Sequence, residues 1–227
     1  MALEPAVARH VGGSYPHNND YRVVGRRVVA KYKLWRRRRV LLRHYPRPLE
    51  SLLDVSCSTG YFTLEAAGRA SCLRAHGIDV DGVDLEAARS VARHLGSRAR
   101  FDQERLHEVA EHLEDRGGAY QLVLLLNAYP YLLMGSHRDE RRYDSHEVIF
   151  EALADVCGDR LLFSNRVELS VLPRNMQARA AELGIGADEY CEGRVRAAAE
   201  RRFRVEDAGR VGRIPLWILS PRRPARP

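Results

Sequence analysis

A short stretch about a quarter of the way along the chain combines one acid with several small residues. It covers residues 54–60, with the sequence DVSCSTG, and lies between a strand-like apolar run and a helical pattern. Small residues at Ser56, Ser58 and Gly60 let the backbone turn tightly and approach a ligand. Free N–H groups at the start of the helix can bind an anionic or polar group. The pattern therefore predicts a ligand-binding loop.

A second acid follows at the end of the next strand-like pattern. Asp79 lies nineteen residues beyond Gly60, and a carboxylate at this place can accept hydrogen bonds from both hydroxyls of a ribose. Asp81 is the better candidate for capping the helix that follows, so we assign the ribose to Asp79. Loop and carboxylate together predict a nucleoside-containing cofactor across the strand ends, where open α/β sheets bind their ligands.

The loop residues favour one such cofactor over another. A dinucleotide pyrophosphate needs the close approach of G-x-G-x-x-G, and serines occupy the first two glycine positions here. Asp54 would also repel a diphosphate. An acid at the end of the first strand suits a cofactor with a cationic ammonium group instead, which points to S-adenosylmethionine.

The ordered set of motifs resembles the class I (Rossmann-like) methyltransferases. Their motif D-x-G-x-G-x-G appears here in residues 54–60 as D-x-S-x-S-x-G, and the acid of their second strand appears as Asp79. Phe101-Asp102 resembles the end of their third strand, and Tyr120–Asn127 (YQLVLLLN) resembles their fourth-strand motif. The resemblance covers roughly residues 50–220. It implies S-adenosylmethionine as cofactor, with these binding residues: Asp54, Ser56, Ser58, Gly60, Asp79, Asp102 and Asn127.

The two serines depart from the family pattern, and they either reduce the affinity or bond the cofactor themselves. Methyl transfer is an in-line displacement that depends on alignment, so no obligatory catalytic residue is implied. A base is needed only where the nucleophile must lose a proton. The candidates are Tyr131, His137 and His146, each of which can also be an ordinary loop residue. No metal site is expected, because His107 and His112 are five positions apart on a helical pattern and do not face each other.

The positive charge is concentrated near the N-terminus. The chain carries a net charge of +7, and the segment Arg22–Arg47 contains eleven Lys and Arg and no acid. Apolar residues at helical spacing predict one amphipathic helix over Tyr21–Tyr45, with Tyr32 and Trp35 on its buried face. Such a helix could cover a small substrate as a lid. The same segment could instead dock RNA through its phosphates.

The sequence leaves the methyl acceptor open. We expect transfer to an oxygen or nitrogen of a small molecule, such as a natural-product intermediate. The alternatives are an RNA methyltransferase that docks RNA on the basic helix and a non-catalytic relative that only binds the cofactor. Strong salt dependence of binding would favour RNA, and failure to bind the cofactor would favour a non-catalytic protein.

Strand-like and helical patterns alternate from about residue 50 onward. Gln121–Leu126 is the clearest strand, and helical patterns of about a dozen residues separate most strands, as in βαβ units. Phe203–Asp207 and Ile214–Leu219 predict a closing antiparallel hairpin. The expected fold is α/β: a doubly wound, mainly parallel seven-stranded sheet with an antiparallel C-terminal strand, preceded by a basic helical segment.

Length and composition limit the class of protein. The 227 residues, 45% hydrophobic and 30% charged, predict an N-terminal segment over 1–48, one globular domain over 49–220 and a Pro/Arg tail over 221–227. The longest apolar run, Leu122–Leu126, is too short to cross a membrane, and the start of the sequence lacks a secretory pattern. Four scattered cysteines without a C-x-x-C pair exclude a zinc ribbon and favour a reducing, cytoplasmic location. The oligomeric state is left open.

Overall fold

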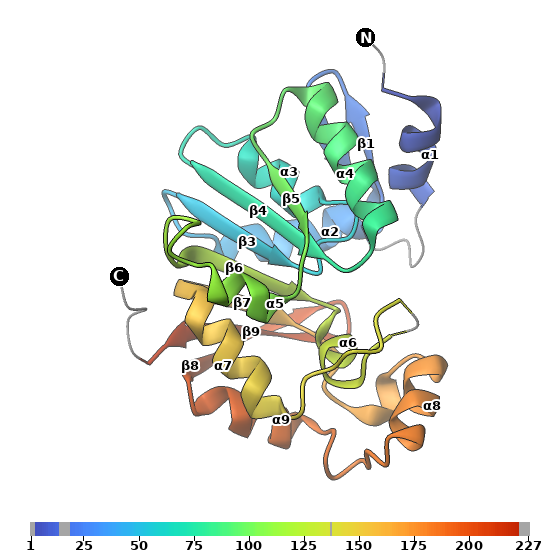
Figure 1. The fold of residues 1–227 in the computed structure, drawn as a ribbon, viewed down its shortest axis with the longest axis vertical. Helices are drawn as coiled ribbons and strands as arrows, with labels where there is room; N and C mark the ends of the chain where they lie inside the picture. The colour runs from blue at the N-terminus through green and yellow to red at the C-terminus, as the bar shows by residue number, and fades with distance from the viewer. Residues whose placement is uncertain (1–2, 14–18, 137, 223–227) are drawn as a thin grey trace. The chain divides into compact units, whose positions relative to one another are not determined.

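The main element of the fold is one seven-stranded sheet of the order β5-β4-β3-β6-β7-β9-β8 (Figure 1). The computed structural model describes residues 3–13, 19–136 and 138–222. The strands of this sheet are β3 (Ser51–Val55), β4 (Arg74–Asp79), β5 (Arg100–Gln103), β6 (Tyr120–Leu126), β7 (Cys157–Ser164), β8 (Phe203–Val211) and β9 (Ile214–Pro221). β4 pairs in parallel with β3 and β5, whereas β9 is antiparallel to β7 and β8. The predicted mainly parallel sheet and its antiparallel closing strand are confirmed.

Helices separate the strands, as the alternating patterns predict. The α-helices are α1 (Pro5–Gly13), α2 (Tyr32–Leu41), α3 (Tyr61–Ala67), α4 (Gly82–Leu95), α5 (Leu106–Glu111), α6 (Tyr129–Met134), α7 (His146–Val156), α8 (Arg174–Glu182) and α9 (Glu192–Glu200). Two short 3-10 turns are η1 (Leu42–His44) and η2 (Leu169–Val171). Among the helices of the described ranges, none is long and apolar enough to cross a membrane.

Capping residues set the ends of α4. The side chain of Asp81 accepts hydrogen bonds from the N–H groups of Val83 and Asp84, which satisfies donors that the first turn leaves unpaired. At the other end Gly96 takes a left-handed conformation with a φ of 61°, as is common for glycine after a helix. The prediction that Asp81 caps this helix is confirmed.

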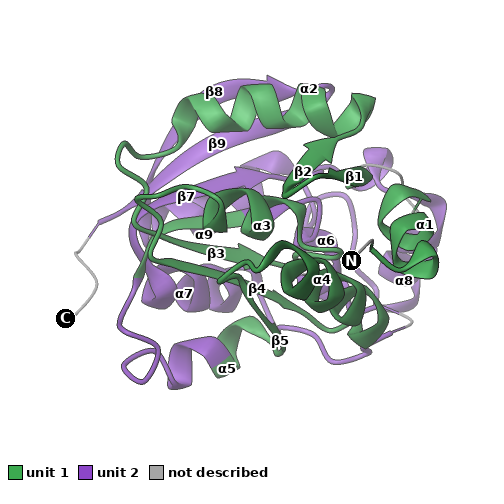
Figure 2. Ribbon diagram, turned by 90° about the horizontal axis from the view of Figure 1, so that it is seen from above, with its two compact units in different colours: residues 1–108, 120–124 green, residues 109–119, 125–227 purple. Residues whose placement is uncertain are grey.

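The chain forms two compact units, residues 1–108 with 120–124 and residues 109–119 with 125–227 (Figure 2). The first has an aliphatic core that includes Leu52 and Leu85, both fully buried. The second contains an aromatic cluster, in which Phe163 stacks on Trp217 with ring centroids 5.1 Å apart and Tyr129 meets Phe163 edge-on at 5.2 Å. The predicted boundaries at residues 48 and 220 stay predictions.

The basic N-terminal segment departs from the single helix predicted over Tyr21–Tyr45, and that prediction is wrong. β1 (Tyr21–Val24) and β2 (Arg27–Ala30) form an antiparallel hairpin, and α2 begins only after it. Valines flank the turn on both sides, and β-branched side chains favour strands. Gly25 supplies the turn with a φ of 57°, which glycine adopts at little cost.

α2 also buries a different face from the predicted one. Leu34, Arg37 and Leu41 are buried, three and four positions apart, as one face of a helix requires. Tyr32 is 67% exposed and Trp35 is 43% exposed, so the prediction that both aromatic side chains are buried is wrong. The apolar period was correct for a helix, but the two leucines, rather than the aromatic residues, select the inner face.

Candidate functional site

In the loop between β3 and α3, every second residue from Ser56 to Gly60 has a left-handed backbone conformation. The φ angle is 60° at Ser56, 51° at Ser58 and 77° at Gly60. This conformation costs a residue with a side chain about 1–2 kcal/mol relative to the right-handed one. The two serines thus adopt the backbone for which glycine is best suited, and the loop makes the tight turn that its small residues predict.

Gly60 lies where no side chain fits. A Cβ atom there would be 2.4 Å from Cε1 of Phe101 and 3.1 Å from Cβ of Ala88. Phe101 belongs to β5 and Ala88 to α4, so both elements pack directly against the glycine backbone. The start of α3 can approach these neighbours only because residue 60 lacks a side chain.

The carboxylate of Asp79 is bound to this loop. Its Oδ2 accepts a hydrogen bond of 2.8 Å from the N–H of Ser58, and its Oδ1 accepts one of 3.0 Å from the N–H of Asp81. A carboxylate offers about four acceptor sites, so it can accept hydrogen bonds from several groups at once. The half-buried Asp79 therefore has the position and the chemistry to bind a diol at the end of β4.

Residues before β3 also reach this loop, which sequence reasoning missed. The hydroxyl of Ser58 donates a hydrogen bond of 2.7 Å to Oδ2 of Asp84, and Nε2 of His10 lies 2.7 Å from the other oxygen of that carboxylate. The buried hydroxyl of Tyr21 donates to the carbonyl oxygen of Thr59 over 2.7 Å. Asp84 thus fixes the side chain of Ser58, which occupies a glycine position of the family motif. Contacts from α1 and β1 also support the loop.

Asp54 is buried beneath the loop, with 3% of its surface exposed. Burial raises the pKa of its carboxyl group to about 7, while a hydrogen bond of 3.2 Å from Thr63 and the positive charge of Arg37 act in the opposite direction. Near neutral pH the group is therefore partly protonated. Its predicted role toward a cationic ammonium group stays a prediction.

The two residues at the end of β5, Asp102 and Gln103, make contacts with different partners. Asp102 forms an ion pair with His76, with Oδ2 2.9 Å from Nε2, while the adjacent Gln103 aligns with Asp79 in the parallel register of β4 and β5. The amide of Gln103 donates to the carbonyl oxygen of Val80 over 3.0 Å. Gln103, which was not identified from the sequence, is thus the β5 residue nearest in register to the diol-binding candidate. The register of a parallel pair could have revealed it.

Asn127 belongs to the second unit and directly follows β6. It has a φ of 60°, and its N–H donates to the carbonyl oxygen of Ser164 over 2.9 Å. Its Oδ1 is buried and accepts no hydrogen bond from the described residues. A fully buried neighbour, Asn165, accepts from the N–H groups of Ala128 and Tyr129 and donates to Leu125. Asn165 was not predicted, and its three hydrogen bonds fix the backbone on both sides of Asn127.

The predicted catalytic candidates have three different settings. The ring of His146 has Nδ1 2.6 Å from the hydroxyl of Tyr129 and Nε2 3.0 Å from the carbonyl oxygen of Glu189. Because a carbonyl only accepts, Nε2 carries the proton in this arrangement, and burial lowers the pKa of the ring. Tyr131 is 39% exposed on α6, and His137 lies outside the described residues. Their catalytic roles stay predictions.

His146 also lines a cavity of about 470 Å³ within the second unit. The walls come from the start of α7, from α9 and from the segment around Gly184, and they carry both basic and acidic side chains. They include Arg142, Asp144, Glu147, Glu189, Arg194 and Arg201. This cavity is a mixed-charge space suited to a polar small molecule.

The fold is similar to that of known methyltransferase structures. The chain is similar to N-methyltransferase NodS from Bradyrhizobium japonicum WM9, with 15% identity, a TM-score of 0.52 and coverage of 85% of this chain and 96% of that chain. It is similar to a geranyl diphosphate methyltransferase in complex with SAM, at 14% identity and a TM-score of 0.54, with 82% and 85% covered. A third similar structure, the [4+2]-cyclase SpnF, has 15% identity and a TM-score of 0.54, with 84% and 81% covered. No family model matches the sequence, and no curated protein matches it.

These similarities define the fold of the chain as that of the class I methyltransferases. The described residues fit the cofactor of that fold. Asp79 places a carboxylate at the end of β4, where it suits ribose hydroxyls, and Gly60 allows a close backbone approach.

Proposed function

We propose that this protein binds S-adenosylmethionine and transfers its methyl group to an oxygen or nitrogen nucleophile of a small molecule. The main support is the hydrogen bond from the Ser58 N–H to Asp79, because it joins a turn of the D-x-G-x-G-x-G type to an acid at the end of the next strand. This is the combination that a ribose and its attached groups require in an open α/β sheet. The fold of the structural neighbours supports the same cofactor.

In this proposal, different parts of the site bind different parts of the cofactor. Asp79 accepts from the ribose hydroxyls, the backbone of residues 56–60 faces the amino-acid part of the cofactor, and Gln103 lies at the adenine side. The bound cofactor would supply a methyl group on a positively charged sulfur. The protein would then need only to align the acceptor with that group and to exclude water, and a base serves only an acceptor that must lose a proton.

The small-molecule acceptor is supported by the neighbours and by the cavity beside His146. One neighbour is named as an N-methyltransferase and another as a geranyl diphosphate methyltransferase. The walls of the cavity carry arginines together with acids, which suits a polar or charged molecule of small size. The four cysteines are free thiols, and we propose a reducing compartment, the cytoplasm, as the location.

Calorimetric titration with S-adenosylmethionine and with its demethylated product tests the cofactor directly. We expect micromolar binding of both, followed by transfer of a labelled methyl group in a screen of hydroxylated and amino-containing metabolites. Absence of binding by either compound up to about 1 mM, equivalent to about −4 kcal/mol, would contradict the proposal. Binding without any transfer would favour the alternative of a relative that only binds the cofactor.

An RNA acceptor is the second candidate, and one observation favours it. Tyr32 and Trp35 are exposed, and the guanidinium groups of Arg36 and Arg39 lie over their rings at 4.8 and 4.9 Å from the centroids. Exposed aromatic rings beside cations are what single-stranded nucleic acids use for stacking and for phosphate contacts. RNA binding that is salt-dependent and requires this face would favour this candidate over the small molecule.

A further inference from the structure

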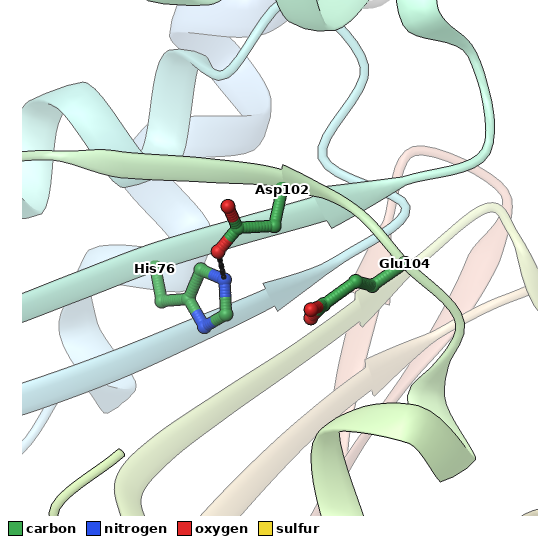
Figure 3. A group of neighbouring side chains, drawn as sticks. All are labelled: His76, Asp102 and Glu104. Carbon is green, nitrogen blue, oxygen red and sulfur yellow. Dashed lines mark ion pairs between the residues drawn. The ribbon is translucent and has the colours of Figure 1, made fainter. Parts of the chain in front are cut away.

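Three side chains converge on the sheet outside the cofactor loop (Figure 3). His76 lies on β4, Asp102 on β5 and Glu104 just beyond β5, and one donor atom from each lies within 4.8 Å of the other two. His76 is 2% exposed, and both carboxylates are half-buried. Successive side chains of a strand alternate between faces, so His76 and Asp102 face away from Phe101, whose ring packs against Gly60.

The imidazole ring of His76 is held in a fixed orientation. Its Nδ1 lies 2.8 Å from the buried hydroxyl of Tyr120, and its Nε2 points at Asp102 with 2.9 Å to Oδ2 (Figure 3). Metal-binding histidines characteristically have the second ring nitrogen hydrogen-bonded in this way. Two ligands with bonds of about 2.1 Å at the tetrahedral angle of a zinc site are about 3.4 Å apart. A separation of 2.9 Å is therefore close to the one at which a single ion contacts both atoms.

We propose that His76, Asp102 and Glu104 bind one divalent transition-metal ion, with Zn²⁺ preferred over Mn²⁺ and Mg²⁺ excluded. An imidazole nitrogen with two carboxylates is a donor set for borderline metals, whereas Mg²⁺ prefers oxygen ligands and retains its waters. Coordination uses the lone pair of Nε2. The one proton of the neutral ring is therefore on Nδ1, which donates to the hydroxyl oxygen of Tyr120, and a ring that starts with both nitrogens protonated releases its Nε2 proton to solvent.

Arg100 competes with the proposed ion for the carboxylate of Asp102. Its Nε lies 2.5 Å from the same Oδ2 of Asp102 that faces His76, and its side chain is 61% exposed. A bound ion would take the place of this guanidinium group beside Asp102, and the long exposed side chain can turn into solvent. The ion would tie β4, β5 and the segment after β5 together, which makes it a stabilising site rather than part of methyl transfer.

The test uses the full chain after treatment with a chelator, titrated calorimetrically with ZnCl₂, MnCl₂ and MgCl₂. We expect one Zn²⁺ per chain, weaker Mn²⁺ binding and no Mg²⁺ binding. Asp102→Asn and Glu104→Gln should each weaken Zn²⁺ binding about 10-fold or more. Glu111→Gln, at an exposed position of α5, is the matched control and should not change it.

Arg100→Gln separates this proposal from a simple ion-pair cluster. Removing the competing cation should tighten Zn²⁺ binding, while the loss of a merely structural ion pair would leave it unchanged. These conservative variants avoid deleting the buried His76, whose replacement could prevent folding. No Zn²⁺ binding below about 1 mM, or equal affinity in wild type, Asp102→Asn and Glu104→Gln, would overturn the proposal.

Discussion

The N–H of Ser58 and the carboxylate of Asp79 are joined by a hydrogen bond of 2.8 Å across 21 positions of sequence. The bond connects the turn after β3 with the end of β4, so two motifs that are separate in the sequence form one binding surface. It also constrains Ser58 to a φ of 51°. A single backbone donor thus fixes both the loop shape and the orientation of the acid.

Replacing Asp79 should therefore weaken cofactor binding. Asp79→Ala removes an ionised acceptor and should reduce the affinity for S-adenosylmethionine by about 1.5–3 kcal/mol, the usual value for hydrogen bonds to a charged group. Calorimetry measures the difference. The control is Glu86→Ala, an exposed acid on α4, which should bind as wild type. Equal affinity in wild type and Asp79→Ala would remove the ribose assignment.

Adding a side chain at Gly60 should damage the loop through a specific neighbour. The Cβ of Gly60→Ala would meet the ring of Phe101, and overpacking of this kind costs about 1–3 kcal/mol. We expect a lower melting temperature and a smaller cofactor-induced shift, partly restored by adding Phe101→Leu. Gly184→Ala is the matched control, because residue 184 has a φ of 71° but nothing near its Cβ position. If both glycine variants lose the same stability, backbone strain rather than Phe101 explains the effect.

The buried Asp54 should make stability depend on pH in a defined direction. Its pKa is raised from an ordinary value of 3.8 to about 7, so between these values the folded state binds more protons than the unfolded state. The free energy of unfolding should therefore fall as the pH rises from about 4 to about 7, by up to about 1.4 kcal/mol for each unit of pKa shift. Asp54→Asn should flatten this dependence in urea denaturation at pH 5, 6, 7 and 8. A profile that remains parallel to that of wild type would show that Asp54 does not carry it.

The exposed face of α2 allows the two acceptor classes to be separated. If RNA is the acceptor, Arg36→Gln with Arg39→Gln should weaken binding of a single-stranded RNA oligonucleotide and reduce the salt slope by about one unit per lost phosphate contact. Fluorescence anisotropy at several salt concentrations measures both. Arg93→Gln with Arg204→Gln, two exposed arginines of other elements, is the matched control.

If a small molecule is the acceptor, the same α2 variants should leave turnover unchanged. Trp35→Ala should then also have little effect on turnover, because the ring is 43% exposed rather than buried as a cover. A large loss of small-molecule turnover in Trp35→Ala would instead support α2 as a lid over the substrate.

Local patterns were sufficient for much of the fold because they are read over short distances. The apolar run of β6 and the periodicity of α7 correspond directly to the observed Tyr120–Leu126 and His146–Val156. The hairpin before α2 was missed because its valines satisfy a helical period as well as a strand period. Contacts between residues that are far apart in the sequence produce no regular spacing in it, so they could not be predicted. His10 and Asp84 are 74 positions apart, and only the strand register places Gln103 beside Asp79.

The support of the loop by α1 and β1 has a consequence for local unfolding. His10 bonds to Asp84, which bonds to Ser58, and Tyr21 bonds to the neighbouring Thr59. Detaching the N-terminal elements would expose the loop and remove partners that hold its two strained serines. In hydrogen exchange, the amides of α1 and those of residues 56–60 should therefore open as one cooperative unit. A ligand that orders residues 56–60 would then slow hydrogen exchange in α1 without contacting α1. The exchange rates of the α1 amides would therefore report whether the site is occupied.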